Sequence, residues 1–180
     1  MKEKLDFKKL YKDLYLPKAK PMLITVPPIC FMMTDGCGAP EGYVEYVMPP
    51  LEGLWEGAGQ GINSDRQGWK WTSLLRQPDF VTEEVFRWAQ TEVRAKKPEI
   101  NAERVRLAVY DEGVCVQMLH VGPYAQEPET LAAMAEFIEK QGLRDDCGGQ
   151  RRHHEIYLGD PRRTAPDKLK TVLRHPVTYR

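Results

Sequence analysis

The stretch that decides the fold begins with Val114-Cys-Val-Gln-Met-Leu-His-Val121 and ends with Arg151-Arg-His-His-Glu-Ile-Tyr-Leu158. Each of these two segments predicts a strand, and Gly122-Pro123 ends the first of them. Between them lies a helical pattern that starts at Pro128, keeps its apolar residues on one face and closes at Gly142. A strand, a helix and a second strand therefore follow one another within 45 residues.

The rest of the chain repeats this alternation. Residues 83–96 predict a helix that Thr82 caps, and Asp111-Glu-Gly113 is a hairpin turn signal. The other expected elements are a short amphipathic helix over 7–16, strands over 22–33, 43–47, 69–75, 104–110 and 171–175, a loop over 143–150, and a helical turn from Pro166. This order predicts the α+β class. The segment from Trp69 to His120 resembles the segment from Val114 onward, which suggests duplicated βαββ modules in an antiparallel sheet.

Length and composition exclude several classes of protein. Of the 180 residues, 42% are hydrophobic, which is enough for a packed core. Lys plus Arg and Asp plus Glu both number 26, and this zero net charge argues against nucleic-acid and anionic-membrane binding. We find no apolar run near the roughly 18 residues of a membrane span, no signal peptide and no paired C-x-x-C cysteines. We therefore expect one cytoplasmic domain over 1–180, with a leading helical arm over 1–20.

Sequence motifs for cofactors and metals are missing. The chain has no P-loop, no strand-linked G-x-G-x-x-G, no G-x-S-x-G elbow and no H-E-x-x-H. His153-His154-Glu155 looks like a metal cluster, but strand alternation turns His154 away from the other two. We therefore expect neither a cofactor nor a metal site.

Aromatic residues lie beside carboxylates on the predicted strands. Trp69 and Trp71 share one strand face, and Glu155 and Tyr157 share another. Rings around a carboxylate suit flat cationic or polarised ligands, through stacking, cation–π attraction and the counter-charge. The same pattern also fits tryptophans in the core and a glutamate in a salt bridge, and spacing alone favours that structural role.

Several runs of sequence resemble the GyrI-like small-molecule-binding proteins. They are Asp79-Phe-Val-Thr82 after Arg76-Gln-Pro78, Val116-Gln-Met-Leu-His-Val-Gly-Pro-Tyr124, His153-His-Glu-Ile-Tyr-Leu-Gly-Asp-Pro-Arg162, Pro49-Pro-Leu-Glu-Gly-Leu-Trp55, Trp69-Lys-Trp71 and Pro166-Asp-Lys-Leu-Lys-Thr171. The resemblance covers nearly the whole chain and is nearest to the stand-alone branch of the family. It implies two βαββ modules related by a pseudo-two-fold axis, with a ligand cleft between them.

The resemblance also implies site residues. Glu155 matches the family's buried acidic group, and Trp71 and Tyr124 match its aromatic walls. Trp55, Trp69 and Tyr157 are further candidates for ligand binding, with a less secure match.

Three functions follow from the resemblance. The first is a cofactor-independent binder of bulky hydrophobic, aromatic or cationic small molecules. The second is a hydrolase that opens the cyclopropane ring of DNA-alkylating toxins. In that case Glu155 positions or deprotonates water, and Tyr124 or Tyr157 hydrogen-bonds the oxygen that gains charge. The third is a protein-interaction module of the DNA gyrase inhibitor type.

One departure from the family pattern concerns the first module. The turn at residues 35–40 usually leads into a helix, whereas here Glu41-Gly42 runs almost directly into the strand over 43–47. We therefore expect the first module to lack its helix, which leaves an apolar sheet face that needs cover. Either residues 7–16 or a second subunit in a two-fold dimer would supply that cover.

Overall fold

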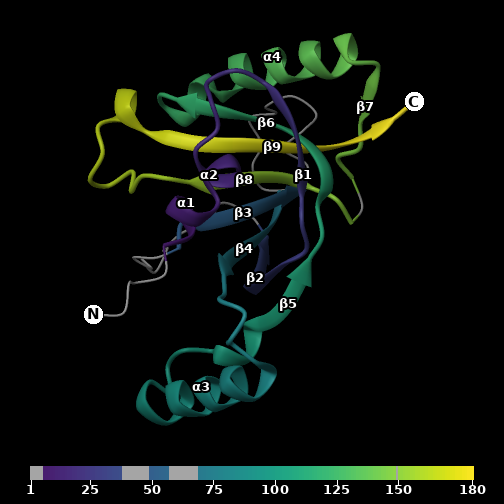
Figure 1. Cartoon of the computed structure of the whole chain (residues 1–180). Coiled ribbons are helices and arrows are strands. Elements are labelled where there is room, and N and C mark those ends of the chain that lie inside the picture. The colour runs from purple at the N-terminus through teal and green to yellow at the C-terminus, as the bar shows by residue number, and fades with distance from the viewer. Residues whose placement is uncertain (1–5, 38–48, 57–68, 149) are drawn as a thin grey trace.

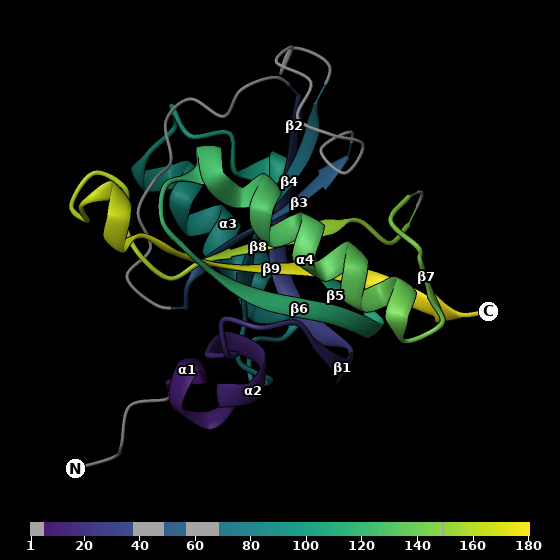
Figure 2. The same ribbon diagram turned by 90° about the horizontal axis from the view of Figure 1, so that it is seen from above.

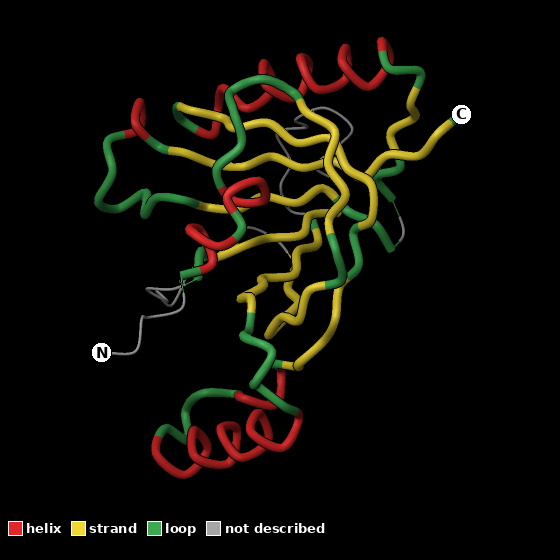
Figure 3. Tube along the Cα trace, viewed as in Figure 1, coloured by secondary structure: helices red, strands yellow, loops and turns green. Residues whose placement is uncertain are grey.

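The computed structural model describes residues 6–37, 49–56, 69–148 and 150–180 (Figure 1). Its helices are α1 (Phe7–Leu10), α2 (Lys12–Tyr15), α3 (Glu83–Lys96) and α4 (Glu127–Lys140), with 3-10 turns η2 (Ala102–Arg104), η3 (Tyr124–Gln126) and η4 (Pro166–Lys168). Its strands are β1 (Met22–Val26), β2 (Ile29–Cys37), β3 (Leu51–Glu56), β4 (Lys70–Arg76), β5 (Arg106–Tyr110), β6 (Gly113–Val121), β7 (Leu143–Asp145), β8 (His153–Tyr157) and β9 (Lys170–Tyr179). Figure 3 shows these helices and strands along the chain. The predicted α+β class is confirmed.

The described strands form one antiparallel sheet, in the order β1-β6-β9-β8-β3-β4-β2-β5, with β7 beside β9. This order contains two equivalent triplets, β2-β4-β3 and β6-β9-β8, which meet where β3 pairs with β8. In each triplet the strand that comes last in the chain, β4 or β9, lies in the middle of the sheet and pairs with the other two. The predicted duplication of strand modules is therefore confirmed.

The boundaries of the repeat differ from the prediction. The repeat starts at β2 and at β6, and not at Trp69, because α3 lies between the triplets and extends away from the sheet (Figure 1). The predicted strand over 43–47 and the expected loss of a first-module helix lie outside the described residues.

The sheet curls at the junction of β1 with β2 and at the junction of β5 with β6, which lie opposite each other. Val26 of β1 pairs with Gly113 of β6, and Ile29 of β2 pairs with Tyr110 of β5. The two intervening prolines therefore lie opposite the Asp111–Glu112 corner, where Gly113 has a φ of 60°. A positive φ of this kind favours glycine. The hairpin predicted at residues 111–113 is wrong, since β5 and β6 pair with other strands and not with each other.

The inner face of the curled sheet holds the larger core. Leu14 and Tyr15 of the arm are buried there, with side chains from β1, β2, β3, β4, β6, β8 and β9. The arm is not the single helix predicted over 7–16, because the non-helical backbone of Tyr11 separates α1 from α2. It packs on the face opposite to α4. The predicted cover for a face left bare by a missing first-module helix depends on residues outside the described ranges, so it stays a prediction.

Helix α4 covers the part of the outer face that β6 and β9 form (Figure 2). Met134 and Ile138 of α4 pack there on Val116, Leu173 and neighbouring apolar residues. In contrast, α3 buries only Phe86, and its Trp88 is 64% exposed. None of the described helices is long and apolar enough to cross a membrane.

Three other expectations need correction. Leu51–Glu56 forms β3, which was not predicted because two prolines and a glycine-rich stretch flank it. The predicted loop over 143–150 contains β7, and the last strand covers Lys170–Tyr179 rather than 171–175.

Candidate functional site

The candidate site lies on the outer face of β8, at the junction of the two triplets. Strand alternation places His153, Glu155 and Tyr157 on this face, as predicted. His153 Nε2 lies 3.0 Å from Glu155 Oε1, and the Tyr157 hydroxyl donates to Glu155 Oε2 over 2.6 Å. Glu155 is only 9% exposed, so its carboxylate is held by neighbours rather than by bulk water.

The adjacent strand β3 supplies Trp55 and Gly53. Trp55 Nε1 donates to the Tyr157 hydroxyl over 3.1 Å, which extends the hydrogen-bonded chain that starts at His153. Gly53 pairs with Glu155, and a Cβ there would lie 2.9 Å from Trp55 Nε1 and 3.3 Å from the Tyr157 hydroxyl. Position 53 therefore has no room for a side chain while this hydrogen bond exists.

Three further aromatic residues lie beside Trp55 and Tyr157, the two rings linked to the carboxylate. The Trp55 and Trp69 rings meet edge to face with centroids 5.7 Å apart, and Trp71 is the β4 partner of Trp55. On the other side, Tyr124 from η3 meets the Tyr157 ring edge to face at 6.2 Å. Edge-to-face contacts of this kind fix ring orientation. The structure therefore joins Glu155, Tyr157 and Trp55 by hydrogen bonds, places Trp69 and Tyr124 in ring contact with them, and pairs Trp71 with Trp55 across two strands. Their roles in ligand binding stay a prediction.

The polar groups of the site have defined protonation preferences. Burial lowers the pKa of His153, and the nearby Glu155 offsets only part of this effect. Burial alone would raise the pKa of Glu155, but its contacts with His153 and Tyr157 reverse the direction and lower it. His153 is therefore a neutral imidazole whose Nε2–H donates a hydrogen bond to the ionised carboxylate of Glu155. His153 Nδ1 and Trp71 Nε1 are buried and have no hydrogen-bond partner among the described residues.

This arrangement offers two chemical capabilities. A buried anion among aromatic rings attracts flat ligands that carry positive charge or polarised bonds. The same carboxylate, fixed by two hydrogen bonds, has the geometry to accept a proton from a bound water molecule. The sequence analysis did not predict three parts of the site. They are His153, Gly53 and the contact between the His153 and His175 rings, which lie 4.8 Å apart. For His153, the only sequence signal was the strand face that it shares with Glu155.

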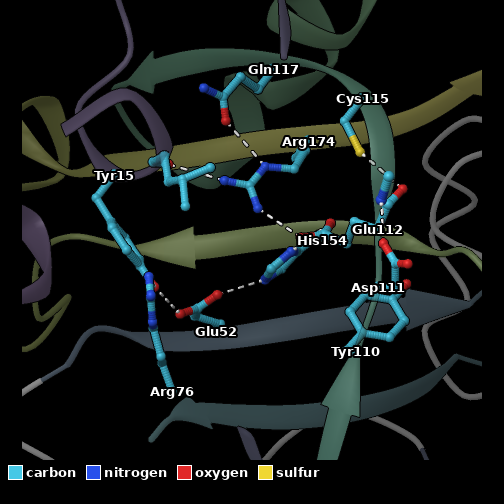
Figure 4. A network of polar contacts seen from close by, with 12 residues as sticks. Tyr15, Glu52, Arg76, Tyr110, Asp111, Glu112, Cys115, Gln117, His154 and Arg174 are labelled. Carbon is cyan, nitrogen blue, oxygen red and sulfur yellow. Dashed lines mark hydrogen bonds and ion pairs between the residues drawn. The ribbon is translucent and has the colours of Figure 1, made fainter. Parts of the chain in front are cut away.

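A second buried polar cluster lies on the inner face, as Figure 4 shows. His154 is completely buried and bridges two carboxylates, with Nδ1 2.9 Å from Glu112 and Nε2 3.0 Å from Glu52. Arg174 also contacts Glu112 over 2.7 Å, and the Tyr15 hydroxyl lies 3.2 Å from Glu52. The predicted separation of His154 from His153 and Glu155 is confirmed, so these three residues do not form one metal cluster.

The charges of the inner cluster balance one another. Burial would lower the pKa of His154, but Glu112 and Glu52 raise it to about 9. Burial would likewise raise the pKa of Glu112, but His154 and Arg174 lower it to about 2. Two carboxylates, one imidazolium and one guanidinium sum to zero charge. Because Arg174 also donates to the Leu14 carbonyl, this cluster ties the arm to the sheet and has a structural role.

The fold and the outer-face cluster define an α+β small-molecule-binding domain. The family model of the GyrI-like small molecule binding domain matches residues 76–178, and the chain belongs to this family. None of the curated proteins matches the chain.

Solved structures from Listeria innocua are similar over nearly the whole chain. An uncharacterized conserved protein is 46% identical with a TM-score of 0.91, and covers 97% of this chain and all of its own. A protein described as a hydrolase is also 46% identical, with a TM-score of 0.87 and the same coverage. The EcmrR C-terminal domain shares only the fold, at 10% identity and a TM-score of 0.59, with 89% of this chain and 98% of its own covered.

Proposed function

We propose that this protein is a hydrolase that opens strained, electrophilic rings in aromatic small molecules. The observation that carries the proposal is the carboxylate of Glu155, which is 9% exposed and fixed by His153 and Tyr157 among aromatic rings. The description of a 46% identical protein as a hydrolase supports catalysis over binding alone. The aromatic rings support a flat, bulky substrate.

The proposed reaction opens a cyclopropane ring that is conjugated to a carbonyl group. Glu155 accepts a proton from water while the water oxygen forms a bond to a ring carbon. The carbon–carbon bond of the strained ring breaks, and its electron pair moves through the conjugated system to the carbonyl oxygen. That oxygen becomes an enolate or phenoxide and takes up a proton from solvent, while Glu155 returns the proton that it accepted to solvent, so one water molecule is added overall.

A hydrogen-bond donor must stabilise the oxygen that gains charge. Tyr157 already donates to Glu155, so its hydroxyl is committed to holding the base. We assign the donor role to Tyr124, whose ring packs on Tyr157, with Trp71 Nε1 as a second donor. His153 is a positioning residue, because it acts on the substrate only through Glu155.

The test uses a cyclopropane-bearing DNA-alkylating natural product and chromatographic detection of the ring-opened, hydrated product. Glu155→Gln keeps the side-chain volume and removes the base, so turnover should fall by roughly 10²- to 10⁴-fold. The control is Glu136→Gln, which changes an exposed carboxylate paired with Lys140 on α4 and should leave turnover unchanged. Equal turnover by Glu155→Gln and the parent protein would refute the role of Glu155.

The second candidate function is binding without catalysis. The observation that favours it is that both oxygens of the Glu155 carboxylate are already engaged, Oε1 by His153 and Oε2 by Tyr157, because hydrogen bonds to the charged form favour a counter-ion over a general base. Binding of a cationic aromatic dye should then weaken by about 1–3 kcal/mol in Glu155→Gln, the range for a hydrogen bond to a charged group. Dye binding that depends on Glu155, with no turnover by the parent protein, would identify a binder. Unchanged dye affinity would exclude Glu155 from the ligand site.

A further inference from the structure

Three potential metal ligands meet at the end of β7, outside the Glu155 site. Asp145, Cys147 and His175 each offer one ligand atom, and these atoms all lie within 4.8 Å of one another. His175 Nδ1 lies 2.8 Å from Asp145 Oδ2, and the Cys147 amide donates to Asp145 Oδ1 over 2.8 Å. One carboxylate therefore has a ligand atom of an imidazole and of a thiol within 4.8 Å.

The backbone around these residues is firmly held. Asp145 pairs with Val177 across the β7–β9 ladder, and the Asp146 amide donates to the Pro176 carbonyl over 2.9 Å. Arg151 fixes the loop that carries Cys147. Its guanidinium contacts the Asp146 carboxylate over 2.8 Å and the carbonyls of Glu112, Val114 and Val177. The three ligands are therefore brought together before any ion arrives, which lowers the entropic cost of binding one.

We propose that Asp145, Cys147 and His175 bind one zinc-like divalent transition-metal ion. Sulfur, nitrogen and oxygen ligands together are typical of zinc sites, and three protein ligands leave the fourth tetrahedral position for water. The thiol proton is released to solvent when the Cys147 sulfur binds the metal. The carboxylate and the thiolate then balance the two positive charges of the ion.

The three ligands reach from the core to the surface. His175 is only 7% exposed and Cys147 is half-buried, whereas the Asp145 side chain is 45% exposed. An ion bound here would therefore rest on a buried imidazole and keep one side open to water. The His175 and His153 rings meet edge to face, so the ion would sit one ring away from the residue that positions Glu155.

The test adds Co²⁺ to the metal-free protein and records the near-ultraviolet thiolate-to-cobalt absorption band, with Zn²⁺ affinity measured by competition. The parent protein should show the band at one equivalent. Cys147→Ser should lose it, and Asp145→Asn should bind Zn²⁺ roughly 10-fold or more weakly, as expected for a lost ligand contact. The matched control is Cys30→Ser, which removes a half-buried thiol on β2 and should keep the band.

Two results would overturn the proposal. One is the lack of a thiolate band in the parent protein, which would leave Asp145 as a hydrogen-bond acceptor only. The other is equal Zn²⁺ affinity in the parent, Cys147→Ser and Asp145→Asn, which would show adventitious surface binding. Neither result bears on Glu155, because the readouts do not depend on turnover.

Discussion

The buried imidazolium of His154 makes fold stability depend on pH in a defined window. Glu112 and Glu52 raise the pKa of His154 from 6.5 to about 9, and the side chain is completely buried. A group whose pKa is raised on folding contributes stability that is fully present below its unfolded pKa and is lost as the pH rises through its folded pKa. A pKa difference of this size corresponds to about 3 kcal/mol. About 2 kcal/mol of this should disappear between pH 6.5 and pH 8.5.

Other titrating groups define the limits of this window. The lowered pKa of His153 costs stability only below about pH 6.5, where the unfolded chain binds the extra proton. Burial raises the pKa of Cys115 and Cys147, so their effect begins near pH 9, where thiols of the unfolded chain ionise. Between these limits His154 dominates the pH dependence.

Urea unfolding at pH 6.5, 7.5 and 8.5 measures the effect. The parent protein should lose stability across the series. His154→Gln should be less stable at pH 6.5 but nearly constant over the same range, because it has no proton to lose. His120→Gln is the matched control, since that buried ring contacts the Thr130 hydroxyl and the Pro123 carbonyl rather than carboxylates, and it should keep the parent's slope. A flat parent curve, or an unchanged slope in His154→Gln, would refute this account.

Four further predictions concern the site, the arm and the oligomeric state. Gly53→Ala should break the hydrogen bond from Trp55 and weaken dye binding about 10-fold, with a stability loss of about 1–3 kcal/mol from the clash, measured by titration and urea unfolding. Trp71→Phe should remove most of the tryptophan quenching by bound dye, and an undiminished quench would make it a packing residue. Deletion of residues 1–16 removes Tyr15 from the core and should abolish the cooperative unfolding transition, whereas a folded truncated chain would contradict the role of the arm. Sedimentation of the full chain at micromolar concentration tests the predicted two-fold dimer, which a clean monomer would exclude.

Local alternation along the strands was enough to predict the site face. On β8 the period of two placed His153, Glu155 and Tyr157 together and turned His154 inward. This succeeded because side-chain alternation is a local property of any strand. The same rule does not reveal what lies opposite, so the contacts of His154 with Glu52 and Glu112 were not predicted.

Pairing partners were harder to predict than strands. Asp111-Glu-Gly113 carries a turn signal, but β5 and β6 pair with the bent β1–β2 strand and together turn a corner. A hairpin and a corner use the same glycine conformation, and only the distant partner decides between them. The constraint on Gly53 was missed for a related reason. The side chains that leave no room there belong to Trp55 and to Tyr157, which lies 102 residues after Trp55 in the chain.

The position of β9 within the sheet has a consequence for synthesis of the protein. Residues Lys170–Tyr179 occupy a central position between β6 and β8, and not an edge. The second triplet therefore lacks its middle strand until residues 170–179 have left the ribosome. Until then β6 and β8 expose unpaired edges, which are prone to pair with other chains. The sheet of the nascent protein should thus be completed only once these residues emerge, and truncation before Lys170 should yield aggregates rather than a smaller folded domain.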